Sequence, residues 1–330
     1  LTGEVWNDAE GVGTILEGNV DVLDRFEEEL RKTVRDEAPL ARIDSVELVQ
    51  TNPALGSTDF VITASRQGTA HTMVTPDAAT CRACAIEMFT PGNRRWRYAF
   101  TNCTHCGPRF TITRSIPYDR PMTSMASFAM CSDCRHEYDD PADRRFHAQP
   151  NACPVCGPQL RLIDTKGSLI DCNDPVVAAA KMIKEGKIVA VKGLGGFHLA
   201  VDAHNANAVF RLRQRKAREA KPLAVMTTNA ASARLWGDFN DIEIELLNSP
   251  ARPIVLARKT ERCRNAFIHV ADDLNEIGLM TAYTPVHLLL FHALAGLPSD
   301  PRWLDAASED ALVMTSANPS GEPLVIHTKV

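Results

Sequence analysis

The N-terminal part of the chain combines short apolar runs with one amphipathic pattern. Between positions 21 and 36, apolar residues recur every fourth position in an otherwise charged stretch, which predicts an amphipathic helix. Short runs typical of strands precede it at 2–8 and 10–18 and follow it at 46–49 and 60–62. This β-β-α-β-β order is what remains of a β-α-β-β-α-β ferredoxin-like sandwich without its first strand and first helix.

The second half of the chain alternates helix and strand patterns. Asp174-Pro175 opens a helical pattern that continues to Lys184 and ends at Gly186, and the apolar run 188–191 then predicts a buried strand. Three further stretches predict strands, at 222–226, 252–256 and 312–315. The patterns together predict an α+β multidomain protein in three parts, which we place at residues 1–71, 75–163 and 173–330.

Composition limits the classes of function. The 330 residues are 45% hydrophobic and 23% charged, as in an ordinary globular protein of two or three domains. No apolar run approaches the roughly 18–20 residues of a membrane span, so no membrane partner is expected. A net charge of -5 argues against a protein that mainly coats nucleic acid, although it permits a local basic site. The chain begins at Leu1 without an initiator methionine, so we expect it to be part of a longer protein.

Eight of the ten cysteines fall in four C-x-x-C pairs, and the last two pairs repeat the first two fifty positions later. Glu87 recurs as Glu137 in the same register, and Arg94-Arg95 recurs as Arg144-Arg145. The stretch is therefore an internal duplication. The paired cysteines are Cys81/Cys84, Cys103/Cys106, Cys131/Cys134 and Cys153/Cys156.

Each copy reads C-x2-C-x18-C-x2-C, and four thiolates close a tetrahedral structural zinc site. We therefore expect two Zn²⁺ ions, with His105, His136 and His147 as bystanders. Disulfides are the alternative, but they need an oxidising compartment, whereas zinc knuckles beside the isolated Cys172 and Cys263 are typical of a reducing cytoplasm. Because each repeat is complete in itself, pairing within a copy is favoured over interleaving of the two copies.

Each copy also carries an arginine pair followed by an aromatic residue, after a turn sequence. Arginines beside aromatics could bind phosphate or nucleic acid. In a domain with so small an apolar core, we favour a structural role in which the stems pack over the zinc knuckle and the charged ends face water.

These cysteine repeats carry a family resemblance. The first copy resembles the duplicated zinc-finger module of the HypF family of hydrogenase maturation carbamoyltransferases. The motif that carries the resemblance is Cys81-x-x-Cys84-x-x-Glu87-Met88-Phe89, continued by Arg94-Arg95-x-x-Tyr98-x-Phe100-Thr101-Asn102-Cys103-x-x-Cys106-Gly107-Pro108-Arg109.

The N-terminal sequence resembles the second half of an acylphosphatase domain, which precedes the zinc fingers in that family. Its motif is Gly3-x-Val5-x-Asn7-Asp8, and the resemblance implies that Asn7 positions an attacking water. The family's phosphate-gripping arginine loop is not in this sequence, so we expect no hydrolase activity from the chain alone. The alternative is that Asn7 is a turn residue.

The C-terminal part resembles a YrdC-type nucleotide-binding domain through Lys216-x-Arg218 and Ser316-x-Asn318. The resemblance implies that these four residues surround ATP, with Mg²⁺, and an acyl-adenylate. Lys192 and His198 begin and end a Gly-rich stretch similar to the carbamoyltransferase variant of this domain. From the residues alone, the alternatives are a tight turn without a ligand at 192–198 and a solvated helix face at 211–221.

The resemblance implies a reaction sequence for the whole family. Carbamoyl phosphate is hydrolysed, the carbamate is adenylated with ATP, and the carbamoyl group passes to a cysteine of a maturation partner protein, where it becomes the cyanide ligand of a nickel-iron site. A module that binds double-stranded RNA through its basic cleft is the alternative function, and a scaffold for the partner protein is a third.

Overall fold

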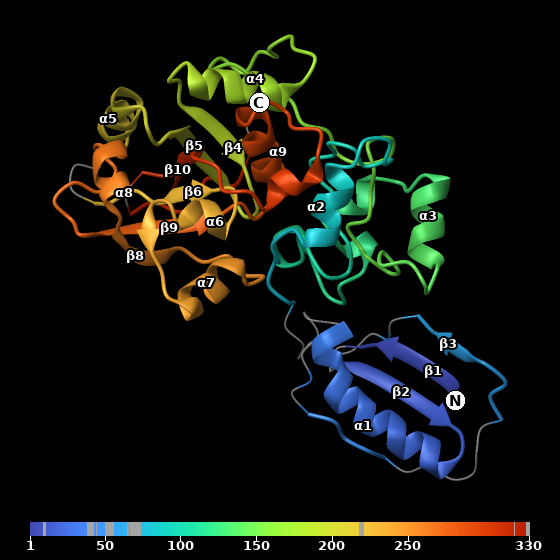
Figure 1. The fold of residues 1–330 in the computed structure, drawn as a ribbon. Helices are drawn as coiled ribbons and strands as arrows, with labels where there is room; N and C mark the ends of the chain where they lie inside the picture. The colour runs from blue at the N-terminus through green and yellow to red at the C-terminus, as the bar shows by residue number, and fades with distance from the viewer. Residues whose placement is uncertain are drawn as a thin grey trace. The chain divides into compact units, whose positions relative to one another are not determined.

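The computed structural model describes residues 1–8, 11–37, 43, 45–49, 56–64, 66, 74–217, 221–319 and 321–327 (Figure 1). The chain forms two compact units. The first comprises Leu1–Pro76 with Ile112–Ser127, and the second comprises Asp77–Thr111 with Phe128–Val330. The α+β class expected from the sequence is confirmed, while the three domain boundaries expected from it remain predictions.

The first unit holds a three-stranded sheet in the order β2-β1-β3, together with one long helix. β1 is antiparallel to β2 and parallel to β3. Gly3 lies in β1 at φ 136°, where a Cβ would stand 2.0 Å from the carbonyl oxygen of Ile15, so only glycine fits. The elements are β1 (Thr2–Asn7), β2 (Val12–Glu17), α1 (Val20–Glu37) and β3 (Phe60–Ile62).

The strand expected at 46–49 is wrong. These residues form no strand, and the side chains of Leu48 and Val49 are 68% and 76% exposed. In the described part of the first sheet, only β2, β1 and β3 are hydrogen-bonded to one another, and residues 46–49 pair with none of them. A short apolar run by itself therefore did not determine a strand, because strand formation needs a hydrogen-bonded neighbour.

The second unit is built on a seven-stranded mixed sheet in the order β4-β5-β10-β6-β9-β8-β7. β6 and β9 are parallel, and the other neighbouring strands are antiparallel. The strands are β4 (Val189–Lys192), β5 (Phe197–Asp202), β6 (Val225–Thr227), β7 (Gly237–Asp238), β8 (Val255–Lys259), β9 (Glu276–Thr281) and β10 (Ala311–Ser316).

Helices lie around this sheet, and two short helices belong to the cysteine repeats (Figure 1). Each cysteine repeat contributes one short helix, α2 or α3. The helices are α2 (Arg82–Met88), α3 (Ser132–Asp139), α4 (Pro175–Lys184), α5 (Ala206–Arg215), α6 (Ala230–Ala233), α7 (Asp241–Asn248), α8 (Glu261–Ala266) and α9 (Pro285–Leu294). No described helix is long and apolar enough to cross a membrane.

The boundaries of α4 confirm the sequence prediction. The Asp174 carboxylate accepts hydrogen bonds from the backbone N–H groups of Val176 and Val177, and Pro175 occupies the first turn. Gly186 adopts φ 78° just beyond the helix and so ends it.

Two of the expected strands differ from the structure in detail. β4 was expected to be buried, but it lies at the edge of the sheet and alternates buried Val189 and Val191 with exposed residues. The strand expected at 252–256 begins only at Val255, because Arg252 adopts φ 44° and Pro253 has no N–H for the ladder.

The core of the second unit lies on both faces of the sheet. Neighbouring residues of one strand enter different apolar clusters, as Val225 and Met226 do in β6, because successive side chains point to opposite faces. The cluster around α4 and α9 also contains Phe89, which follows α2 in the first cysteine repeat. Phe89 is fully buried, with its ring 4.6 Å from that of His292 and 4.9 Å from that of Trp303. The first cysteine repeat and the sheet thus share one apolar core.

Candidate functional site

The eight paired cysteines form two separate clusters, each made from one repeat. Within each cluster, all four Sγ atoms lie within 4.8 Å of one another. Each repeat places its first two cysteines at the start of a short helix, α2 or α3, and its last two on a tight turn that closes over them. The pairing is therefore within each copy, as the duplication predicted, and not interleaved.

The spacing of the sulfurs fits a tetrahedral metal site. The Sγ of Cys103 lies 3.7 Å from that of Cys81 and 3.8 Å from that of Cys106. The corresponding distances around Cys153 and Cys156 in the second repeat are also 3.7–3.8 Å. A zinc–sulfur bond of about 2.3 Å places neighbouring sulfurs about 3.8 Å apart, whereas a disulfide requires about 2.05 Å. All ten cysteines are free. The two clusters could therefore each hold one metal ion, and they contain no disulfide.

The metal-ligand clusters among the described residues consist of cysteines alone. His105, His136 and His147 lie outside them, as expected. The ring of His147 instead packs against Tyr138, at 4.9 Å, and against Phe146, at 4.5 Å.

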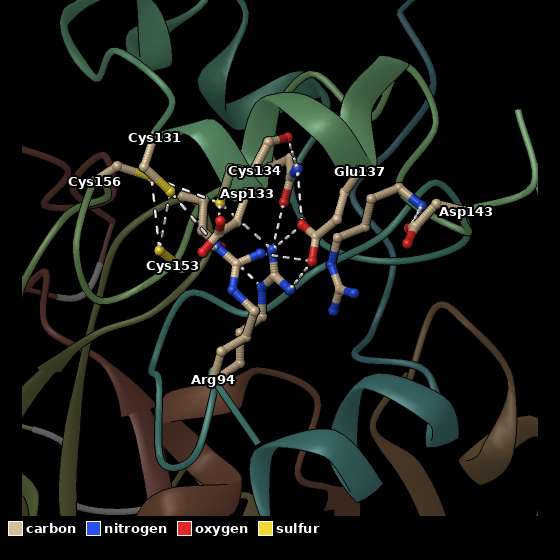
Figure 2. Close-up of polar contacts among 12 residues, drawn as sticks. Arg94, Cys131, Asp133, Cys134, Glu137, Asp143, Cys153 and Cys156 are labelled. Atoms are coloured by element: carbon tan, nitrogen blue, oxygen red, sulfur yellow. Dashed lines mark hydrogen bonds and ion pairs between the residues drawn. The ribbon is translucent and has the colours of Figure 1, made fainter. Parts of the chain in front are cut away.

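The second arginine of each pair does not face water, and for these two residues the sequence prediction is wrong. Arg95 and Arg145 are 1% and 3% exposed. The Arg95 guanidinium donates two hydrogen bonds to the Glu137 carboxylate, at 2.8 and 2.5 Å. Arg94 donates one to the same carboxylate at 2.6 Å, and Figure 2 shows Arg94 and Glu137 side by side. Buried guanidinium groups require such partners. The sequence did not show them because each glutamate belongs to the other repeat.

The same contacts hold the two glutamates in their charged form. Burial alone would raise the pKa of each carboxyl group, but the arginines oppose it by hydrogen bonding and charge. They hold the pKa of Glu137 at about 2 and keep that of Glu87 below its ordinary value.

The structure brings four of the predicted nucleotide-binding residues together in the second unit. Lys216 follows α5, and its Nζ donates to the backbone carbonyls of Ser316 and Asn318, the latter at 2.8 Å. Ser316 ends β10 and is paired with His198 of β5 in the sheet register. These four residues come from three separate stretches of the sequence, namely the Gly-rich stretch 192–198, the basic run that holds Lys216, and the pair Ser316 and Asn318. The end of β10 is where they meet, because Ser316 pairs with His198 and its carbonyl accepts from Lys216.

A cavity of about 500 Å³ lies beside this junction. His198 and Ser316 line it, and so do the cations Lys221 and Arg252 and the phenol of Tyr283. The volume is within the range of about 300–1,000 Å³ that is usual for small-molecule sites. With two cations on its wall, the cavity suits an anionic ligand.

Other predicted residues lie apart from the cavity or outside the description. Lys192 ends β4, and its Nζ lies 5.5 Å from the centre of the Phe197 ring; it does not line the cavity. The Gly-rich stretch between these two residues is a hairpin turn, closed by a hydrogen bond from Gly193 N–H to Gly196 O. Arg218 lies outside the described residues. Asn7 ends β1 in the first unit and has an exposed side chain.

Sequence reasoning missed four residues in or behind this wall: Lys221, Arg252, Tyr283 and His287. Lys221 belonged to a recognised basic run, and Arg252 was read only as the start of a strand. The guanidinium of Arg252 donates to the Thr281 hydroxyl at 2.8 Å, which holds it beside β9. The two aromatic residues stand in an apolar stretch with no motif, so they gave no signal in the sequence.

His287 is fully buried behind His198, and neither of its ring nitrogens has a hydrogen-bond partner among the described residues. Burial lowers the pKa of both histidines, and that of His287 falls to about 3. Both imidazoles are therefore neutral at neutral pH, so the cations of this wall are lysine and arginine.

Two family profiles match the chain. The family described as "Telomere recombination" (Sua5, YciO and YrdC) matches residues 181–330, which contain the seven-stranded sheet. The family described as "HypF finger" matches twice, at residues 80–113 and 130–163, over the two cysteine clusters.

Curated relatives match almost the whole chain. It is 51% identical over 327 residues to carbamoyltransferase HypF2 of Cupriavidus necator, an alignment that covers 98% of this chain and 40% of that protein. It is 38% identical to the probable carbamoyltransferase HypF of Methanocaldococcus jannaschii, over 98% of this chain and 40% of that protein. The chain thus spans about 40% of the length of these relatives.

Solved structures agree with these sequence matches. A crystal structure of full-length HypF in the phosphate- and nucleotide-bound form is similar with a TM-score of 0.85 and 39% identity, over 98% of this chain and 40% of that chain. The crystal structure of T. kodakarensis HypF has a TM-score of 0.82 and 40% identity, over 98% of this chain and 39% of that chain.

Proposed function

Because the chain belongs to the HypF carbamoyltransferase family, we propose that its seven-stranded sheet domain binds ATP with Mg²⁺ and forms or holds carbamoyl-adenylate. In this role it serves the maturation of nickel-iron hydrogenase in the cytoplasm. Carbamoyl phosphate is the source of the carbamoyl group, and a cysteine of a maturation partner protein is the acceptor. The similar HypF crystal structure described as nucleotide-bound supports this assignment.

The observation that carries the proposal is the position of Lys216 over the end of β10. Its ammonium group is held on the carbonyls of Ser316 and Asn318, at the side of a cavity that two further cations line. A triphosphate in this cavity would meet Lys221 and Arg252 on the wall, with Lys216 beside the wall at Ser316. Cations gathered around one cavity favour an anionic substrate.

The chemistry follows from that charge. A carbamate oxygen attacks the α-phosphorus of ATP, the bond to the β-phosphate oxygen breaks, and pyrophosphate leaves with its electron pair. Negative charge develops on the phosphate oxygens as this happens, and fixed cations beside them stabilise it. The hydroxyl of Ser316 and the amide of Asn318 supply hydrogen bonds that orient the nucleotide.

We also propose that the two cysteine clusters bind one structural zinc ion each. Four thiolates fill the coordination sphere, so the metal contributes folding energy and leaves no open position for chemistry. Since Phe89 joins the first repeat to the core of the sheet domain, the metal-bound module also supports the wall that carries the cavity.

The experiment is a titration of ATP and Mg²⁺ into the full chain by isothermal calorimetry, with the Lys216→Ala variant beside it. Lys187→Ala is the matched control, because Lys187 is an exposed lysine paired with Glu185. We expect Lys216→Ala to weaken ATP binding at least tenfold and Lys187→Ala to leave it unchanged. The proposal fails if the wild-type chain has no affinity for ATP. It also fails if Lys216→Ala weakens binding of double-stranded RNA and leaves ATP binding intact.

A further inference from the structure

The two cysteine repeats exchange their arginine pairs. Arg94 and Arg95 of the first repeat reach the Glu137 carboxylate of the second. Arg144 and Arg145 of the second repeat reach the Glu87 carboxylate of the first. Each arginine and each glutamate stands fifty positions from its counterpart in the other repeat. The same contact is therefore made twice, once from each repeat to the other.

Arg94 and Arg95 also contact the sulfurs of the second cluster. Arg94 Nη2 lies 3.2 Å from the Sγ of Cys134 and 3.5 Å from that of Cys131, and Arg95 Nη2 lies 3.6 Å from Cys134 Sγ. Figure 2 shows the guanidinium of Arg94 between these sulfurs and Glu137. The second cluster therefore receives N–H donors from the first repeat.

The first cluster receives the corresponding contacts from the second repeat. Arg144 Nη1 lies 3.3 Å from the Sγ of Cys84 and 3.9 Å from that of Cys81. Beside it, Arg145 is buried, and its Nε donates to the carbonyl of Asn102 at 3.0 Å, just before the third cysteine of the first cluster. In the second cluster, Arg95 Nε donates to the carbonyl of Ala152 at 2.9 Å. Ala152 occupies the position in the second repeat that Asn102 occupies in the first.

Electrostatics gives these contacts a consequence for metal retention. Four thiolates and one divalent cation leave about two negative charges in a buried site. Guanidinium groups that donate to the sulfurs offset this charge and fix the orientation of the ligands, as the outer partners of metal ligands generally do. Arg94 and Arg95 donate to sulfurs of the second cluster, and Arg144 donates to sulfurs of the first. For each arginine pair, one glutamate carboxylate holds both arginines in position.

We propose that each repeat supplies the N–H donors and positive charge that retain the metal of the other repeat. The inference rests on the proposed zinc binding. It makes the duplication functional: neither tetracysteine site is complete without the second copy, and an arginine of one repeat is a positioning residue for the metal of the other.

The test uses the prediction that changing an arginine of one repeat weakens metal retention in the other repeat. Zinc-loaded full-length chain is incubated with EDTA and N-ethylmaleimide, and peptide mass spectrometry follows alkylation of each cysteine, because only released thiols react. The variants are Arg94→Met and Arg144→Met, whose native side chains are 30% and 29% exposed and are thus safer to change than the buried Arg95 and Arg145. Arg135→Met is the matched control, since Arg135 is exposed on α3 and pairs with Asp139.

We expect Arg94→Met to accelerate alkylation of the second cluster about tenfold or more, relative to the first cluster, and Arg144→Met to do the reverse. Arg135→Met should change neither. Equal acceleration of both clusters, acceleration in the variant's own repeat, or no change overturns the inference. If Arg94→Met does not fold, Arg94→Lys replaces it as the test variant. One ammonium group cannot span two sulfurs and Glu137, so alkylation of the second cluster must still be faster than in the wild-type chain. Absence of zinc from the wild-type chain would instead refute the proposed metal binding.

Discussion

Acid should weaken the second unit through His287. The imidazole is fully buried in α9, 4.6 Å from the ring of Tyr283 and 5.9 Å from that of His198, measured between ring centres. Burial is the main reason that its pKa falls to about 3, and the charge of His198, when protonated, lowers it further. An imidazole in the unfolded chain has a pKa of about 6.5.

The sign of the effect follows from these two pKa values. Between pH 6.5 and about 3 the unfolded chain binds a proton on His287 that the folded chain does not. The contribution of the neutral imidazole to stability is therefore complete above pH 6.5 and falls as the pH drops below it. One pH unit below the unfolded pKa, at pH 5.5, the loss from this residue is about 1.4 kcal/mol.

Urea unfolding followed by circular dichroism at pH 7.5 and pH 5.5 measures this loss. Other groups also titrate in this window, so the readout is the difference between the wild-type chain and His287→Phe, which keeps a ring of similar size. We expect the loss in unfolding free energy between the two pH values to be about 1.4 kcal/mol smaller in the variant. His136→Gln, a change at an exposed histidine, is the control. If the wild-type chain and His287→Phe lose the same unfolding free energy between pH 7.5 and pH 5.5, His287 is not a buried neutral imidazole in the folded chain.

Three further predictions concern stability and metal content. Asp174→Ala removes the cap of α4 and the ion pair with Arg97, and should lower the unfolding free energy in urea by about 1 kcal/mol; an unchanged value would contradict the cap. Phe89→Ala opens a cavity where the first repeat meets α9 and should cost about 3–5 kcal/mol in the same assay, whereas a loss below about 1 kcal/mol would mean that the repeat and the sheet do not share a core. Elemental analysis should find about two zinc ions per chain, and dialysis against a chelator should lower the unfolding midpoint; about one zinc would contradict one metal ion in each of the two clusters.

Local signals in the sequence were sufficient for the features that depend on neighbouring residues. The C-x-x-C spacing fixed both ligand sets, because a complete unit within each copy leaves no reason for exchange of cysteines. Asp174-Pro175 and Gly186 marked the ends of α4, since capping is decided within one turn of the helix.

Features that depend on distant partners were not predictable from these signals. The arginine pairs looked solvent-facing because their glutamate partners lie about forty to sixty residues away, in the other repeat. The run at 46–49 had the composition of a strand but no described neighbour to pair with. His287 is an isolated histidine in an apolar helix, and only the fold shows that it lies behind the wall of the cavity.

A crystal structure of the chain with Mg²⁺ and a non-hydrolysable ATP analogue tests the proposed function most directly. We expect the phosphates to lie in the cavity beside β10, within hydrogen-bond distance of the Lys216 ammonium group and of Ser316 or Asn318. A nucleotide bound elsewhere on the chain, or a cavity that stays free of nucleotide at saturating concentration, would contradict it.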